Sequence, residues 1–361
     1  MENENRDSVS DEPSIQPLQL SGTGLSDTLY KMLTPGVGRG NGLAQNQYQL
    51  YNRIVLESVD TKATEFSSES EVVKAAGQFG VLRQFTDRYI LGATLDVSVS
   101  DGSTDNTLDS RCNIDSVGEE EGYSAGIGII QTLLLNDFVS LSANLSGFTF
   151  EDTYRRSLCL LTEETDIFFP DPEDENHIPA GIGERFEGVI TGKPSGLKLS
   201  AAVEARASFR VAALIVNPHI GFVGSETSID PYTETDSGDT GATLQYDARE
   251  ESSRIAQWGL SLELPLQSRR GIVSPFIDMT GFREHGDGQQ RLIAQFSEDN
   301  RNTPTRFSFL STPVDRDYGM VALGVDWYYR PGAVGQIKIQ SLLGNDFSDV
   351  MQVEARLAIS F

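Results

Sequence analysis

Apolar and polar residues alternate strictly at the end of the chain. From Met351 to Phe361 every odd position is apolar, whereas the even positions include Glu354 and Arg356. A period of two residues predicts a strand with two different faces. One face is apolar and the other carries both signs of charge, which is typical of a barrel strand between lipid and a polar lumen. A strand of a soluble β-domain can show the same pattern, so repetition along the chain decides between the two.

The alternation begins at Tyr48 and recurs to the end of the chain. The polar parity is rich in Gly, Ser and Ala, which favours a narrow lumen that is filled with water or plugged by a helix. The first strand is the least secure, because Asn52 lies on its apolar parity. The twelve predicted strands span residues 48–59, 71–85, 88–100, 121–134, 137–151, 197–209, 211–225, 252–266, 271–284, 317–330, 334–343 and 348–361.

The parity also predicts which side chains face lipid. Near the middle of the membrane we expect outward-facing Leu95, Val203, Leu260 and Leu323, and inward-facing Ser98, Ala202 and Gly324.

The connections between these strands alternate in length. Most of the odd-numbered connections are long, at 101–120, 152–196, 226–251 and 285–316, and every second connection is short. Short periplasmic turns and long extracellular loops alternate in this way in outer-membrane barrels. We therefore predict an all-β, 12-stranded antiparallel transmembrane β-barrel over residues 47–361. The start of the first strand and the end of the last strand should both lie on the short-turn side.

Residues 1–46 lack strand alternation. Ser26-Asp27 could cap a short helix through 29–33 that Pro35-Gly36 would end. We expect 1–46 to be a linker with a short helical segment, part of which, within 14–46, lies in the lumen. The polar start of the chain has no apolar segment of the kind found in signal peptides.

Composition excludes some classes of function. A formal net charge of −25 argues against nucleic-acid binding, which needs basic surfaces. No run of about 18 apolar residues is present, so no transmembrane helix is predicted.

The sequence offers no catalytic or metal centre. His177, His219 and His285 have no ligand partners at metal-binding spacing, and we assign no nucleophile, no enzyme activity and no cofactor. We predict that the acidic segments 101–121 and 171–175 are solvated loops, and cation binding is the alternative. Cys112 and Cys159 lie in predicted outer loops, where they could pair or remain free thiols.

Charged residues on the polar parity are the candidate functional side chains. We expect them to face the lumen, chiefly as paired charges across neighbouring strands and also as contacts for whatever lies in the pore. They are Lys198, Glu204, Arg206, Glu263, Asp326, Arg330, Lys338, Glu354 and Arg356.

Five short motifs occur in the order of one known family. They are QFTDRYILGA at 84–93, GYSAGI at 122–127, SPFI at 274–277, DRDY at 315–318 and SLLG at 341–344. Together with the terminal Phe361 they resemble the autotransporter β-domain, the translocator of type V secretion in Gram-negative bacteria. The resemblance covers roughly residues 48–361, and this sequence lacks the passenger and the signal peptide of that family.

The resemblance implies location and partners. It implies a monomeric barrel in lipid of the cell outer membrane that supports export of an N-terminal passenger polypeptide. It also implies recognition of the terminal strand by the barrel-assembly machinery, through Val353, Ala355, Leu357, Ile359 and Phe361. The alternatives are a passive outer-membrane pore or structural barrel without a passenger, and a soluble β-rich binding protein.

Overall fold

The fold was analysed in a computed structural model of the chain. The structure describes residues 48–62, 69–104, 118–161, 185–238, 240–285, 291–299, 301–310, 315–329 and 332–361. The predicted linker and helix in 1–46 lie outside the described residues. Among the residues described, no helix is long and apolar enough to cross a membrane.

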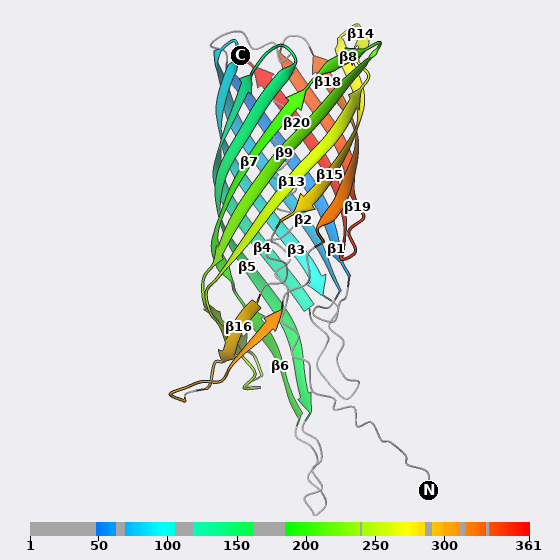
Figure 1. Cartoon of the computed structure of the whole chain (residues 1–361). Helices are drawn as coiled ribbons and strands as arrows, with labels where there is room; N and C mark the ends of the chain where they lie inside the picture. The colour runs from blue at the N-terminus through cyan, green and yellow to red at the C-terminus, as the bar shows by residue number, and fades with distance from the viewer. Residues whose placement is uncertain are drawn as a thin grey trace, which may run out of the picture.

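Twelve antiparallel strands form a closed barrel (Figure 1), as predicted. Each strand pairs with the next along the ring, and the ring closes where β20 pairs with β1. The barrel strands are β1 (Tyr48–Thr61), β2 (Ser70–Thr86), β3 (Tyr89–Thr104), β4 (Gly118–Leu134), β5 (Val139–Leu161), β7 (Ser195–Ala207), β9 (Leu214–Ile229), β13 (Arg249–Glu263), β15 (Gly271–Glu284), β18 (Asp317–Tyr329), β19 (Ala333–Leu343) and β20 (Ser348–Ser360).

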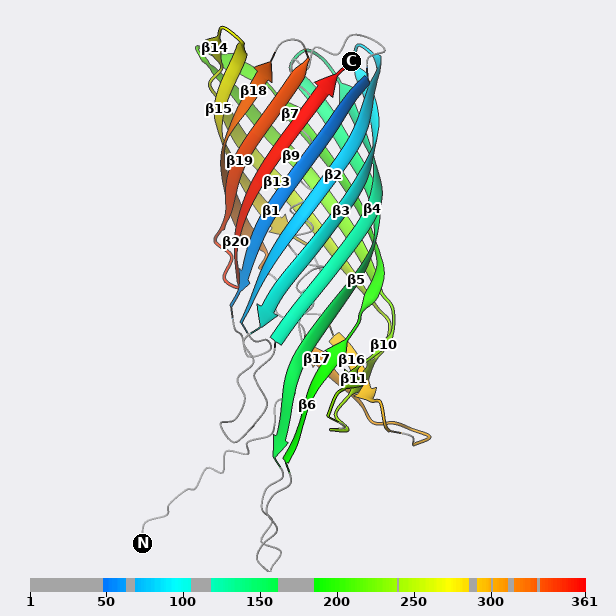
Figure 2. The ribbon, with the colours of Figure 1, turned by 180° about the vertical axis from the view of Figure 1, so that it is seen from behind.

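The closing seam joins the first and last strands, which lie side by side in Figure 2. The register runs from Gln49 opposite Ser360 to Thr61 opposite Ser348. At its end, Tyr48 and Phe361 exchange backbone hydrogen bonds of 3.3 and 3.0 Å, and their rings stack with centroids 6.3 Å apart. Closure matters because an open edge would leave N–H and C=O groups unpaired in lipid.

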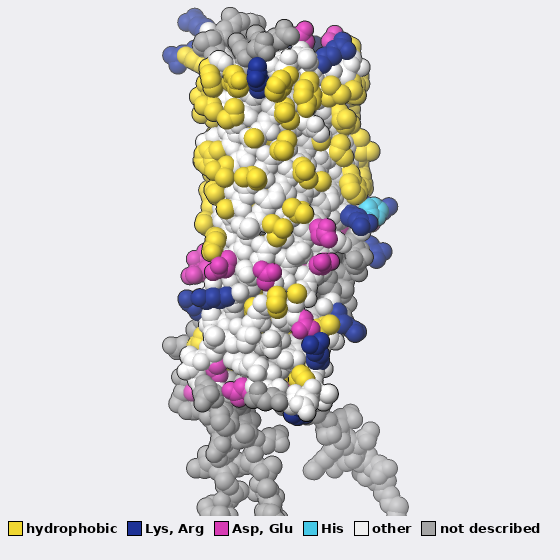
Figure 3. Space-filling view, turned by 90° about the vertical axis from the view of Figure 1, so that its left-hand side faces the viewer, with side chains coloured by type: hydrophobic (Ala, Val, Ile, Leu, Met, Phe, Trp, Pro, Cys, Tyr) yellow, Lys and Arg dark blue, Asp and Glu magenta, His cyan; other side chains and the backbone are white. Residues whose placement is uncertain are grey.

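Exposure alternates along the strands with the predicted period. Leu95, Val203 and Leu323 are exposed on the outer surface, and Leu260 is half-buried. The apolar residues of the terminal stripe, from Val353 to Phe361, are likewise exposed. Asn52 faces outward as its parity requires, because its neighbours Tyr51 and Arg53 are buried. Figure 3 shows the resulting apolar band on one face of the barrel.

Short turns gather at one end of the barrel, together with the C-terminus (Figure 1). Between β4 and β5, the Asn136 side chain accepts hydrogen bonds of 2.8 Å from the N–H groups of Phe138 and Val139. The turn predicted near Arg210 lies further along the chain. Strand β8 (Phe209–Val211) continues the ladder against β9, so the reversal falls at Ala212, which has a φ of 54°. A second short strand at this end, β14 (Leu266–Ser268), pairs with β15.

The long-loop end carries structure that the sequence analysis assigned to loops. Strand β5 extends to Leu161 instead of ending at 151, and β6 (Arg185–Gly192) pairs with this extension. The pair protrudes beyond the barrel wall (Figure 1). We call this pair and the strands that flank it the outer extension. Its other strands are β10 (Tyr232–Thr233), β11 (Thr235–Asp236), β12 (Leu244–Tyr246), β16 (Arg291–Phe296) and β17 (Arg306–Leu310).

The outer extension has its own apolar core. Strand β11 pairs with β6, whereas β10, β12, β16 and β17 form a separate four-stranded sheet. Buried Leu244, Tyr246, Leu292 and Ala294 pack together in that sheet. Tyr232 also stacks on Tyr246, with ring centroids 4.7 Å apart. The outer extension is therefore packed structure formed by segments far apart in the sequence.

Candidate functional site

The barrel interior holds the described members of the predicted set of charges. Lys198, Glu204, Glu263, Lys338 and Glu354 are buried. Arg206, Asp326 and Arg356 are half-buried on the same inward parity. Arg330 lies outside the described residues.

One carboxylate organises the charges at the closing seam. Glu354 is fully buried, and Arg53 Nη2 and Lys338 Nζ lie 2.8 and 3.1 Å from its Oε2 atom. Arg356 Nη2 lies 2.7 Å from its Oε1 atom. A single anion is thus shared by three cations from β1, β19 and β20. Charge-assisted hydrogen bonds of this length are the strong kind.

The register explains why the carboxylate is needed at that position. Arg53 of β1 lies directly opposite Arg356 of β20. Like charges that face each other across a ladder are destabilising. Glu354 lies two positions before Arg356 on the inward face of β20, contacts both guanidinium groups, and neutralises part of their repulsion. This cluster therefore stabilises the seam where the barrel closes.

Polar side chains continue from this cluster along the inner wall. Gln352 donates a 2.8 Å hydrogen bond to Glu57 Oε2 and accepts one from Gln340. Gln336 donates a 2.7 Å hydrogen bond to Asp326. On the far wall, Arg206 Nε lies 3.0 Å from Glu204 Oε1, and Gln257 donates to the other oxygen of Glu204 at 3.3 Å.

Several inward charges were not predicted. Arg53 and Glu57 are buried on β1, and Lys74 and Asp96 are buried on β2 and β3. The signal was present in 48–59, because Gln49, Arg53 and Glu57 share one parity there. If Asn52 is accepted as a polar residue on the outward, apolar parity, Arg53 and Glu57 fall on the inward parity.

The inward-facing wall of the barrel is partly apolar in the half nearer the long loops. Val223, Ile255, Phe282, Tyr318, Met320, Leu342 and Val350 form one buried cluster on neighbouring strands. These large apolar side chains are an exception to the inward parity rich in Gly, Ser and Ala that the sequence analysis described. The interior therefore has a charged part at the seam and an apolar part toward the long-loop end.

A histidine inside the barrel has hydrogen-bond partners but not in a catalytic order. His219 Nε2 lies 3.1 Å from Thr280 Oγ1, and that hydroxyl donates to Asp278 at 2.8 Å. The Thr280 hydroxyl lies between His219 and Asp278. In an activated nucleophile the histidine would lie in the middle, with the hydroxyl on one side and the carboxylate that orients the histidine on the other. Among the described residues, no group of three or more His, Cys, Asp and Glu could hold a metal ion.

Other predicted loop features lie partly outside the described residues. Cys112, the segment 171–175 and His177 are outside them, so the pairing with Cys159 and cation binding stay predictions. His285 is exposed at the outer end of β15.

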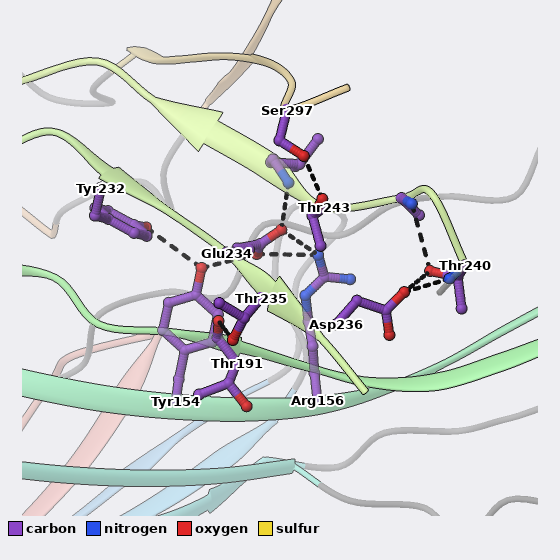
Figure 4. A network of polar contacts seen from close by, with 12 residues as sticks. Tyr154, Arg156, Thr191, Tyr232, Glu234, Thr235, Asp236, Thr240, Thr243 and Ser297 are labelled. Atoms are coloured by element: carbon purple, nitrogen blue, oxygen red, sulfur yellow. Dashed lines mark hydrogen bonds and ion pairs between the residues drawn. The ribbon is translucent and has the colours of Figure 1, made fainter. Parts of the chain in front are cut away.

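A second buried carboxylate lies in the outer extension (Figure 4). Glu234 accepts a 2.8 Å hydrogen bond from the Tyr154 hydroxyl and ion-pairs with Arg156 Nη2 at 3.1 and 3.2 Å. The backbone N–H of Leu244 donates to its Oε2 atom at 2.9 Å. Glu234 therefore fastens the connection between β9 and β13 to the protruding part of β5.

The chemistry of this network keeps its donors protonated. Burial, together with Tyr232, Tyr246 and Glu234, raises the pKa of Tyr154 well above its ordinary value. Burial acts to lower the pKa of Arg156, but the carboxylate of Glu234 outweighs it, and the pKa is raised. Tyr154 and Arg156 thus remain donors to Glu234 at neutral pH.

The next turn of the same connection has an acidic cap. Asp236 accepts a 2.8 Å hydrogen bond from the N–H of Gly238 and further bonds from the hydroxyl and N–H of Thr240. Burial acts to raise the pKa of Asp236, but these hydrogen bonds outweigh burial and lower it.

These features define a class of protein: a closed, 12-stranded barrel with an apolar outer band and a charged interior. Within that class, the model of the autotransporter β-domain family matches residues 171–337, which confirms the predicted resemblance to this family. The match and the fold together support an outer-membrane translocator barrel that anchors a passenger.

Solved structures with similar folds include autotransporter barrels. The translocator domain of NalP from Neisseria meningitidis has 12% sequence identity and a TM-score of 0.60, over 88% of this chain and 90% of that chain. The transport unit of AIDA-I from Escherichia coli has 12% identity and a TM-score of 0.57, over 93% and 97% of the two chains. The β-domain of the Bordetella autotransporter BrkA has 14% identity and a TM-score of 0.54, over 88% and 100%. A comparison with curated protein sequences found no match.

Proposed function

We propose that the chain is the translocator of an autotransporter, anchored in the outer membrane of a Gram-negative bacterium, and that it carries an N-terminal passenger to the cell surface. The observation that supports this most directly is the start of β1. Tyr48 lies beside Phe361 at the short-turn end, which faces the periplasm in outer-membrane barrels. A passenger attached before Tyr48 would therefore enter the lumen from the periplasmic end.

The interior suits a polypeptide as its occupant. Side-chain oxygens of Asn144, Ser200 and Ser274 are buried inside the barrel and have no hydrogen-bond partner within the described residues. Peptide groups are suitable partners for such atoms. The apolar inner cluster around Ile255 and Phe282 suits apolar side chains, and we propose that part of 14–46 occupies the lumen after export.

Surface display tests the proposal. We would fuse a signal peptide and an epitope ahead of Met1 and add protease to intact cells. Export predicts that the epitope is digested from outside, while the barrel keeps its heat-modifiable migration on gels. An epitope that stays protected in cells with a folded barrel would contradict the translocator function.

The passive pore is the alternative function, and conductance distinguishes it. The full chain and a chain beginning at Gln47 would be compared in planar bilayers. We expect low conductance for the full chain and a larger, open-pore conductance for the shorter one. Equal open-pore conductance of the two would favour the passive pore.

We also propose that the barrel-assembly machinery recognises the terminal stripe Val353, Ala355, Leu357, Ile359 and Phe361. Deletion of Phe361 should reduce outer-membrane insertion far more than the loss of its contacts, about 2–3 kcal/mol, would explain. Deletion of residues 1–10 is the control. Wild-type levels of folded barrel without Phe361 would contradict this role.

A further inference from the structure

A basic patch lies on the outer surface in a strongly acidic chain. Arg254, Arg283, His285 and Arg316 are exposed at the long-loop ends of β13 and β15 and just before β18. The backbone joins them, because the N–H of His285 donates to the carbonyl of Arg254 at 2.7 Å and the N–H of Glu284 donates to that of Arg316 at 2.8 Å. Figure 3 shows basic side chains beside a histidine at the right-hand edge, just beyond the apolar band.

Only part of this positive charge is neutralised nearby. Arg283 makes a two-point contact with Asp317, at 2.7 and 3.1 Å. Arg254 and Arg316 make no ion pair within the part of the chain that the structure describes, although exposed Glu226 lies near Arg254 on β9. Among the described residues, Arg254 and Arg316 therefore provide two exposed guanidinium groups without an ion pair.

An apolar groove begins directly below the patch. Gly281 of β15 lies opposite Gly319 of β18, and both face outward without side chains. They are two positions further into the barrel than the Arg283–Asp317 pair. The hollow has a volume of about 530 Å³, and the outward-facing side chains that line it are those of Trp258, Leu260, Met279, Val321 and Leu343.

We propose that the groove and the patch together bind one phosphorylated lipid of the outer leaflet, of the lipid A type. An acyl chain lies in the groove over Gly281 and Gly319, and a phosphate group contacts Arg254 and Arg316. Guanidinium groups bind phosphate oxygens through paired, charge-assisted hydrogen bonds. This inference rests on the membrane orientation in the proposed function, but it does not depend on passenger export.

Native mass spectrometry of the full-length barrel in neutral detergent tests the site. The protein would be titrated with lipid A, with fully dephosphorylated lipid A, and with inorganic phosphate alone. We expect one tightly retained lipid A, weak retention of the dephosphorylated form, and no binding of free phosphate. Folding of every variant would be checked by heat-modifiable migration.

Two variants separate the roles of headgroup and groove. Arg254→Gln with Arg316→Gln should weaken lipid A binding by roughly tenfold or more. The matched control, Lys62→Gln with Arg155→Gln, removes the same charge from exposed residues just after β1 and on β5, and should leave affinity unchanged. Equal losses in both would mean general charge attraction and would overturn the proposal.

A second pair of variants tests the groove by filling it with a side chain. A side chain at Gly319 has space, because the nearest atom to an added Cβ is 3.6 Å away. Gly319→Leu should therefore keep the fold and reduce lipid A retention, whereas Gly77→Leu, at an outward-facing glycine on β2, should not. Unchanged retention in Gly319→Leu would overturn the proposed groove. These outcomes are independent of epitope display, so each proposal can fail separately.

Discussion

Two buried carboxylates hold the two regions of this molecule together in different ways. Glu354 in the barrel is shared by three cations on adjacent strands, and Glu234 in the outer extension binds one guanidinium, one phenol and one backbone N–H. Barrel register alone brings the partners of Glu354 together. The partners of Glu234 meet only after a loop folds back onto β5. The comparison shows that a buried carboxylate can obtain its partners in two ways: from the regular register of neighbouring strands, or from a loop that folds back onto a distant strand.

The largest effect should come from Glu354→Gln. The substitution leaves Arg53, Lys338 and Arg356 facing one another without an anion. Breaking a buried ion pair by removing one partner typically costs about 3–5 kcal/mol. Urea unfolding in lipid vesicles, followed by heat-modifiable migration, would measure the loss. A change below about 1 kcal/mol would mean that the three cations are already screened by other groups.

The position of Glu354 was predictable only in part. Strict alternation in 351–361 places Glu354 and Arg356 on the inner face, because a strand has a period of two. Arg53 was missed because Asn52 obscured the parity of 48–59. Its contact with Glu354 was not predictable, because the register between β1 and β20 depends on barrel closure. Parity therefore predicts which way a side chain faces, and register determines what it contacts.

The outer extension shows what sequence patterns miss. The twelve barrel strands have at least 11 residues each, whereas β10, β11 and β12 have 2, 2 and 3. A period of two cannot be recognised in so few residues. Strand β10 pairs with nearby β12, whereas β11 pairs with β6 and β12 with β16, both of which are distant in sequence. Glu234 was consequently left in a predicted loop.

The second largest effect should be local to the outer extension. Glu234→Gln removes the ion pair with Arg156 and weakens the bond from Tyr154. We expect amide exchange in β10 and β12 to become roughly a hundredfold faster, while β1 and β20 are unaffected. Hydrogen exchange with mass spectrometry would detect this. Faster exchange across the barrel as well would contradict the separation of the two regions.

A smaller, pH-dependent effect should come from Asp236. Its pKa is lowered in the folded protein, so its stabilisation is present above its ordinary pKa, about 3.9, and is lost as the pH falls through the folded value. Carbon-detected NMR titration of the carboxyl should give a midpoint below the ordinary value. Asp236→Asn should speed exchange at Thr240 at neutral pH and remove the acid dependence of that exchange. A midpoint at or above the ordinary value would contradict the cap.

The smallest effect belongs to Arg155, and its neighbour on β5 provides the comparison. Arg155 pairs with Glu119 at 3.2 Å, and both side chains are about half exposed, at 46% and 56%. Arg156 pairs with Glu234 at 3.1 Å, with side-chain exposures of 10% and 0%. Exposed ion pairs are typically worth about 0–1 kcal/mol, whereas breaking a buried pair costs several times more.

Arg155→Met and Arg156→Met therefore remove the same side chain from adjacent positions of one strand. Amide exchange of β6 and β10 should change little in the first variant and strongly in the second. High salt should reduce the small effect at Arg155 further, because exposed charges are screened, and should hardly alter the effect at Arg156. Similar changes in both variants would mean that β-pairing alone, and not the buried carboxylate, holds the outer extension on β5.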